Sequence, residues 1–272
     1  MRMNGALSSH AIIILIRKEW AELYRNTLVL GSVVFMPLLF AAIPIIMLWS
    51  MGDIASEGMG EIAMGAPQAM LATCGDLSAG ACSLAFFLAQ FNMMFMFIPI
   101  MLPATIIPYA IVGEKTQHSL EPLLATPIST VDLLLAKSLA AIIPAILATW
   151  LSFGIYAVAT WFLVTEKAIL GMIFRPHWLF AIVVLGPLLA LLTALLALMI
   201  SSRSNEPRTA QQVAGLVVLP IILLFIGQVS GLVFITPVLT FVIGLVALII
   251  DVILLYLAVR IFDREAILTR WA

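Results

Sequence analysis

The chain has 272 residues, of which 64% are hydrophobic and only 10% carry a charge. Soluble globular domains carry roughly 25% charged residues, so this composition excludes a water-soluble protein. The net charge is −1 and the basic residues are scattered, so we expect no nucleic-acid partner. We predict one membrane domain over residues 1–272, in contact with the lipid bilayer.

A charged segment precedes the first long apolar stretch. Within it, apolar residues recur at helical spacing, at Ile12, Ile16, Trp20 and Leu23. Charged residues fall on the other face, and helices of this kind lie in the plane of the membrane interface. We therefore predict an amphipathic interfacial helix over about residues 9–26, in which Arg17 and Lys18 face lipid phosphates or a cytosolic partner. The alternative is a helix that only anchors the chain.

Long uncharged windows organise the rest of the chain. A bilayer core of about 30 Å needs roughly 20 apolar residues in a helix. Five windows qualify, and the last, from Thr209 to Ile250, is long enough for two crossings with a turn near Gly227–Gly231. We predict an all-α, polytopic membrane protein with six transmembrane helices, at about residues 28–51, 85–112, 138–164, 178–201, 211–231 and 237–260.

The basic residues predict the orientation of these helices. Eleven of the thirteen lysines and arginines fall on one side of the predicted spans, and only Lys167 and Arg175 fall on the other. Positive charge is retained on the cytoplasmic side of a membrane. We therefore expect a multi-pass protein of the cell membrane with both termini in the cytoplasm.

The first predicted external loop, residues 52–84, contains both cysteines of the chain. Cys74 and Cys82 would face an oxidising compartment, in which a disulfide can form. Their spacing does not show whether the two Cβ atoms meet, so the bridged and the free state both stay open.

The sequence offers no catalytic or cofactor site. The three histidines lie outside the centres of the spans, which leaves no pair to bind haem and no intramembrane metal cluster. Gly113-Glu114-Lys115-Thr116 lacks the upstream glycine and the adjoining Gly-Lys pair of a phosphate-binding loop. We expect a chain that is not an enzyme and that holds no cofactor or metal.

Asp251 is the one carboxylate within a predicted span. A charge at the centre of a transmembrane helix costs about 2.5 to 3.5 kcal/mol on insertion scales, so this side chain should face the bundle interior or water, or be protonated. It could contact a proton, a cation or a substrate, or serve as a buried polar anchor. A self-contained ion-coupled transporter or channel using Asp251 is therefore one candidate function.

The predicted cytoplasmic segment 113–129 carries the most specific pattern. It contains Glu114-Lys115, then Ser119-Leu120-Glu121, then Leu123-Leu124-Ala125-Thr126-Pro127 and Ser129, followed by Lys137. Pro122 suits the first turn of a short helix that Pro127 would end, leaving its leucines to pack outside the bilayer. This pattern resembles the first cytoplasmic loop of type-2 ATP-binding-cassette (ABC) exporter permeases.

Weaker similarities at Ile16–Trp20 and Arg260–Leu268 extend the resemblance over most of the chain, whereas Gln117 and His118 depart from the family pattern. The resemblance implies a permease subunit that pairs with a second permease, identical or similar, and docks separate cytoplasmic ATPase subunits that bind the ATP. Segment 113–129 would be the coupling helix. The implied ATPase contacts are Glu114, Lys115, Glu121, Leu123 and Leu124, joined by Arg17 and Lys18 of the N-terminal helix. The apolar spans favour an amphipathic or lipid-like cargo.

Overall fold

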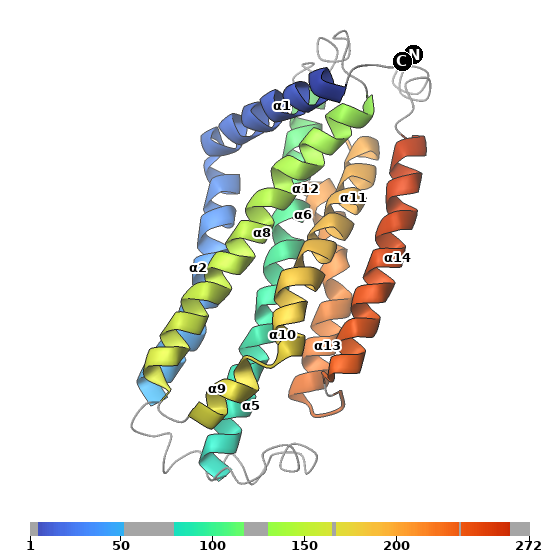
Figure 1. Cartoon of the computed structure of the whole chain (residues 1–272). Coiled ribbons are helices and arrows are strands. Elements are labelled where there is room, and N and C mark those ends of the chain that lie inside the picture. Colours follow the sequence, from blue (N-terminus) through green and yellow to red (C-terminus); the bar gives the residue numbers. More distant parts are fainter. Residues whose placement is uncertain (1–4, 52–78, 117–129, 165–166, 234, 262–272) are drawn as a thin grey trace.

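The computed structural model describes residues 5–51, 79–116, 130–164, 167–233 and 235–261. All regular elements in these ranges are helices, and six helical segments are long and apolar enough to cross a membrane. The predicted all-α, polytopic membrane fold is therefore confirmed. The helices form one elongated bundle, and the first described helix begins at the same end of it at which the last described helix finishes (Figure 1).

The chain begins with two helices that meet at a sharp bend. Helix α1 (Gly5–Arg25) lies across one end of the bundle, and α2 (Thr27–Met51) runs along the bundle from there (Figure 1). Asn26 separates them and accepts a hydrogen bond at Oδ1 from the backbone N–H of Val29, 3.3 Å away. An asparagine in this position satisfies a free N–H group of the first turn, so it begins α2.

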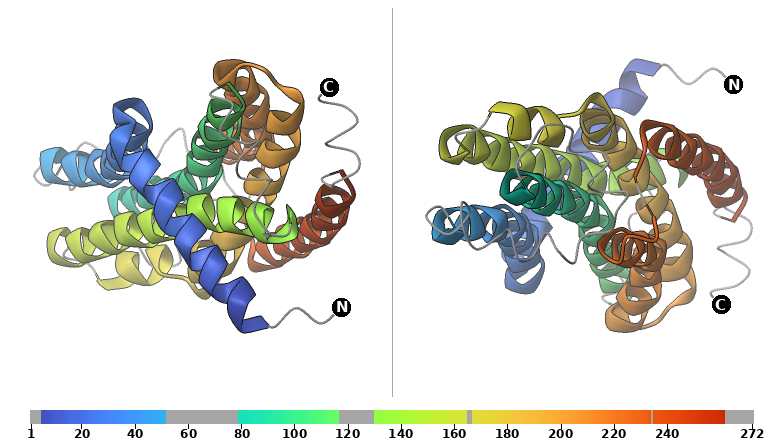
Figure 2. Two further views of the ribbon diagram at one scale, coloured as in Figure 1. Left: turned by 90° about the horizontal axis from the view of Figure 1, so that it is seen from above. Right: turned by 90° about the horizontal axis from the view of Figure 1, so that it is seen from below.

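The second crossing is made of α5 (Ala79–Met94), a 3₁₀ turn (Phe95–Phe97) and α6 (Ile98–Thr116). It is the most buried crossing of the bundle. The third is the single long helix α8 (Thr130–Leu163). Helix α6 packs against α2, α8, α11 and α12, and therefore forms the centre of the bundle (Figure 2).

The second half of the chain completes the bundle. Helices α9 (Lys167–Ile173) and α10 (Pro176–Phe180) lead through a π-helical turn (Ala181–Leu185) into α11 (Gly186–Arg203). The fifth crossing comprises α12 (Pro207–Gly215), a 3₁₀ turn (Leu216–Val218) and α13 (Leu219–Val229). The sixth is α14 (Pro237–Ile261), which packs mainly on α11 and exposes most of its apolar side chains.

Three crossings change helix type just before a proline. The 3₁₀ turns and the π-helical turn lie within six residues upstream of Pro99, Pro187 and Pro220. Proline has no N–H group to donate to the carbonyl oxygen four residues earlier, which permits a local change of helix type. It does not impose one, because Pro37 and Pro144 lie within continuous α-helices. At the π-helical turn, Trp150 of α8 donates from Nε1 to the carbonyl oxygen of Ile182, 3.2 Å away.

The turn between α13 and α14 contains the one described glycine with a left-handed backbone. Gly231 has a φ of 72°, and the N–H groups of Leu232 and Val233 both donate to the carbonyl oxygen of Gly227, at 2.9 Å. Glycine adopts this conformation without the clash that a Cβ atom would cause. The turn expected near Gly227–Gly231 lies here.

Several helices extend beyond the predicted crossings. Helix α5 begins at Ala79, within the predicted external loop 52–84, and α6 continues to Thr116, within the predicted coupling segment 113–129. Helix α8 begins at Thr130, ahead of the predicted crossing at 138. Uncharged windows mark the residues that suit the hydrocarbon core, whereas a helix satisfies its own backbone in the polar headgroup layer as well.

Candidate functional site

Helix α1 is held against the bundle by its apolar face. Leu15 is buried against Leu133 and Ala136 of α8. Trp20 donates a hydrogen bond from Nε1 to the carbonyl oxygen of Ala140, 3.0 Å away. The apolar face that predicted an interfacial helix therefore contacts α8, and α1 crosses over the end of α8 (Figure 2).

Four charged side chains from α1, α6 and α8 meet beneath this crossing and form what we call the ion-pair cluster: Lys18, Glu19, Glu114 and Lys137. Lys137 Nζ lies 2.7 Å from Glu19 Oε1 and 2.9 Å from Glu114 Oε2. Lys18 Nζ lies 2.6 Å from Glu114 Oε1 and 3.3 Å from Glu22. Each lysine thus bridges α1 to α6, and Lys137 adds α8.

The cluster is largely shielded from solvent. The side chains of Lys137, Glu19 and Glu114 are 3%, 5% and 6% exposed, whereas Lys18 is 37% exposed. Buried ion pairs gain little net stability over apolar residues, but removing one partner leaves an uncompensated buried charge. The cluster therefore holds the three helices in one specific arrangement and penalises their separation.

Burial and charge together set the protonation of the two cluster residues on α1. Burial raises the pKa of Glu19, and the charge and hydrogen bond of Lys137 oppose this effect only in part. Burial alone would lower the pKa of Lys18, but the hydrogen bond and charge of Glu114, with Glu19 and Glu22, raise it above the ordinary value. Lys18 is therefore charged at neutral pH.

The structure places the predicted coupling residues in different surroundings. Glu114 faces inward to Lys18 and Lys137, so its carboxylate is not presented to a partner. Lys115 donates to Asn205 Oδ1, 2.8 Å away, in the connection between α11 and α12. Arg17 is exposed on α1. The remaining predicted contacts, Glu121, Leu123 and Leu124, lie outside the described residues, so their role stays a prediction.

Two members of the cluster, Glu19 and Lys137, were not among the predicted site residues. Glu19 lies four residues from both Leu15 and Leu23, so the helical period places it on the packed face of α1. A carboxylate at such a position requires a buried cation. Lys137 follows the 113–129 pattern as its trailing lysine. These two signals could have identified the pair.

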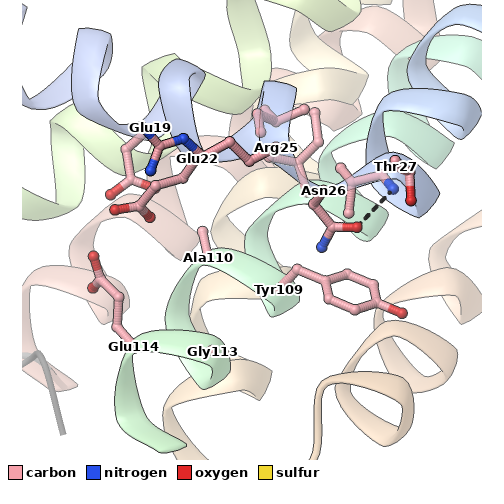
Figure 3. Close-up of a pocket in the computed structure, with 12 residues that line it drawn as sticks. Glu19, Glu22, Arg25, Asn26, Thr27, Tyr109, Ala110, Gly113 and Glu114 are labelled. Carbon is pink, nitrogen blue, oxygen red and sulfur yellow. Dashed lines mark hydrogen bonds between the residues drawn. The ribbon is translucent and has the colours of Figure 1, made fainter. Parts of the chain in front are cut away.

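A cavity of about 620 Å³ lies beside the cluster, between α1, the start of α2 and α6. Its lining includes Glu19, Glu22 and Arg25 of α1 and Glu114 of α6. Figure 3 shows the three carboxylates pointing toward one another across the space between these helices, with Tyr109 and Asn26 farther along it. The cavity is therefore polar at the cluster and apolar where Val29 and Ile106 complete its lining.

A second cavity, of about 390 Å³, lies between α6 and α12. Polar side chains line it from both helices, among them Thr105, Arg208 and Gln211. Gln211 Nε2 lies 3.3 Å from Thr105 Oγ1 and joins the two helices. Tyr109 lines both cavities, so one face of α6 connects them.

The other predicted sites stand apart from the cluster. Asp251 is 2% exposed on α14, on the side that faces α11, and neither carboxylate oxygen has a hydrogen-bond partner among the described residues. Cys82 is buried on α5, whereas Cys74 lies outside the described residues, so their disulfide stays a prediction. No group of three or more His, Cys, Asp or Glu suited to a metal occurs in the described ranges.

The family model described as ABC-2 family transporter protein matches residues 13–258, which is most of the chain. The match begins within α1 and ends in the last turn of α14, so it includes all six apolar crossings and the ion-pair cluster. A comparison with curated proteins found no match.

Proposed function

Because this chain belongs to the ABC-2 transporter family, as the match over residues 13–258 shows, we propose that it works as the permease of an ATP-driven exporter. Membership makes it a membrane-spanning ABC permease subunit. The proposal adds that two such subunits form a translocation pathway, and that separate ATPase subunits in the cytoplasm bind and hydrolyse the ATP.

The ion-pair cluster is the observation that carries the coupling step of this proposal. Residues 117–129 connect the end of α6 to the start of α8, and the cluster joins exactly these two helices to α1. A force applied by an ATPase to this connection or to α1 would therefore reach all three helices together. Switching transitions of this kind need elements that move as packed units.

The cluster also changes how Glu114 would act in coupling. Its carboxylate is committed to Lys18 and Lys137, so it would position α1 against α6 rather than touch the ATPase. The exposed side chain of Arg17 is available for a direct contact. Glu121, Leu123 and Leu124 remain the proposed contacts from the connection itself.

The polar cavity between α6 and α12 supports a pathway at this face of the bundle. A cavity that presents Arg208, Gln211 and Thr105 is unsuited to lipid tails, because polar groups in hydrocarbon need partners. We propose that this face of α6 and α12 lines the pathway and that a second permease closes it from the other side. Its side chains would contact the polar part of an amphipathic cargo.

Purification from the native membrane under mild conditions tests the proposal. The chain is captured by an affinity tag, bound proteins are identified by mass spectrometry, and ATP hydrolysis by the eluate is measured. A cassette ATPase in about equal amount, with vanadate-sensitive hydrolysis, is the expected result. Recovery of the chain alone, without hydrolysis after mild crosslinking, would contradict the proposal.

A matched pair of variants tests the cluster in that complex. Glu114→Gln removes the charge that both cluster lysines contact, whereas Glu206→Gln removes an exposed carboxylate ahead of α12. In vesicles that contain the complex, we expect Glu114→Gln to lower the amount of cargo exported per ATP hydrolysed. Equal export per ATP in the two variants would show that the cluster has no part in coupling.

A further inference from the structure

The cavity beside the ion-pair cluster lies where the charged end of the bundle meets its apolar flank. Helix α1 carries Arg17 and Arg25, whereas α2, which starts one residue after Asn26, contains no charged residue. Several apolar side chains are exposed along α2, and Phe35, for example, is 64% exposed. The cavity lining includes both Asn26 and Thr27, at this boundary. In a membrane, this boundary is the level of the lipid headgroups.

The charges around the cavity are not matched one to one. Three carboxylates, those of Glu19, Glu22 and Glu114, line it and face one another (Figure 3). Two ammonium groups serve all three: Lys137 contacts Glu19 and Glu114, and Lys18 contacts Glu114 and Glu22. Glu22 makes the longest of these contacts, at 3.3 Å, and its side chain is 49% exposed. Among the described residues, Glu22 shares Lys18 with Glu114, so Glu22 is the carboxylate with capacity for another cation.

A cation-binding group and an anion-binding group thus line the same cavity. Arg25 is exposed in the last turn of α1, lines the cavity, and makes no ion pair with any described residue. A guanidinium presents a planar set of donors that suits phosphate. A ligand that carries an ammonium next to a phosphate would complement both Glu22 and Arg25.

We propose that this cavity binds the phosphoethanolamine headgroup of an aminophospholipid. The ammonium would lie against Glu22 and the phosphate against Arg25, while the acyl chains would continue along the apolar flank of α2. A volume of about 620 Å³ is within the range of sites that hold a small molecule. The site requires only that α1 lies at the membrane surface, so it is independent of coupling to an ATPase.

The lining also favours a primary ammonium over the trimethylammonium of choline lipids. A primary ammonium donates three hydrogen bonds and can serve more than one carboxylate. Quaternary ammonium groups are recognised by cages of several aromatic rings. Tyr109 is the single aromatic residue in the lining, so such a cage is absent from the cavity.

Competition between lipids tests this site in the full-length permease. The protein is purified in detergent, exposed to equal amounts of phosphatidylethanolamine, phosphatidylcholine and phosphatidylglycerol, and the retained lipids are measured by native mass spectrometry. We expect phosphatidylethanolamine to be retained about tenfold over the other two, because a hydrogen bond to a charged group accounts for a difference of that order. Glu22→Gln and Arg25→Gln should each reduce this retention about tenfold.

Arg203→Gln is the matched control, because it removes an exposed positive charge from the last turn of α11, outside the cavity lining. It should leave retention unchanged, and circular dichroism should show that all three variants are folded. Equal retention of the ethanolamine and choline lipids, or loss in only one of the two cavity variants, would overturn the proposal. Binding of soluble glycerophosphoethanolamine as tightly as the lipid would overturn the assignment to a membrane lipid.

Discussion

Lys137 is the residue on which the three-helix arrangement depends most directly. Its side chain is 3% exposed and contacts the carboxylates of Glu19 and Glu114 on two other helices. Lys137→Met keeps a long unbranched side chain but leaves both carboxylates with less compensation. Breaking a buried pair by removing one partner costs roughly 3–5 kcal/mol, so we expect a loss of that size in the free energy of unfolding, measured by denaturant titration in detergent.

The appropriate control for Lys137→Met is Lys18→Met, because Lys18 contacts the same Glu114 from a partly exposed position. Solvent compensates a partly exposed charge, so this change should cost much less. If the two variants were equally stable, the shielding of the cluster would have no energetic consequence.

The raised pKa of Glu19 predicts a pH dependence with a definite sign. A carboxyl group whose pKa is higher in the folded than in the unfolded state stabilises the fold fully below the unfolded pKa. That stabilisation is lost as the pH rises through the folded pKa. The unfolding free energy of the parent minus that of Glu19→Gln should therefore decrease as the pH rises above the ordinary glutamate pKa of about 4.3. Thermal unfolding over a series of pH values measures it, and a difference that increases with pH would contradict the assignment.

Asp251 separates the permease function from the ion-coupled alternative. Its carboxylate is buried on α14 without a hydrogen-bond partner among the described residues, so its removal relieves an unsatisfied polar group. We expect Asp251→Ala to retain or raise the melting temperature and to keep ATP-dependent export. Complete loss of transport in a folded Asp251→Ala variant, together with transport by the parent that follows an ion gradient, would favour the alternative.

At the scale of the helices, the turn between α13 and α14 depends on a single residue. Gly231 is the left-handed residue between α13 and α14, with a φ of 72°. Gly231→Ala should lower the free energy of unfolding by about 1–2 kcal/mol, because a Cβ atom in this conformation approaches the following carbonyl oxygen. Gly154→Ala is the control: this glycine lies within α8 and has no atom within 4 Å of an added Cβ. It should stabilise the protein by roughly 0.5–1 kcal/mol in the same unfolding measurement.

The helical elements follow from local sequence, whereas the site does not. Uncharged windows predict the six crossings. The prolines do not predict where the helix type changes, because Pro37, Pro44 and Pro144 lie within continuous α-helices. The meeting of Glu19, Glu114 and Lys137 depends instead on how α1 crosses α8, which is decided by contacts such as Trp20 with Ala140, 120 residues apart. Local periodicity indicates that Glu19 lies on the packed face of α1, but it does not indicate which helices cross that face.

At the scale of the whole molecule, the ion-pair cluster links helix α1, at one end of the bundle, to the two cavities along α6. Glu114, in the last turn of α6, belongs to the cluster, and Tyr109, five residues earlier on the same helix, lines both cavities. A displacement of α1 that pulls on Glu114 would therefore move the helix that forms a wall of the proposed pathway. Under the proposed function, this is a short physical route from an ATPase contact to the cargo.

Association with the ATPase gives the prediction that belongs to the assembled exporter. Arg17 is exposed on α1, whereas the next residue, Lys18, is paired with Glu114. An acidic patch on the ATPase would therefore contact Arg17 rather than Lys18. Arg17→Glu should slow association of the ATPase subunit, and added salt should shrink the difference from the parent, because charges at the rim of an interface act mainly on the association rate. Arg203→Glu, an exposed charge reversal in the last turn of α11, is the matched control.

Surface plasmon resonance on the reconstituted permease measures the association and dissociation rates of the ATPase subunit separately. Equal association rates for both variants would place the ATPase contact away from α1 and leave the connection between α6 and α8 as its one proposed route.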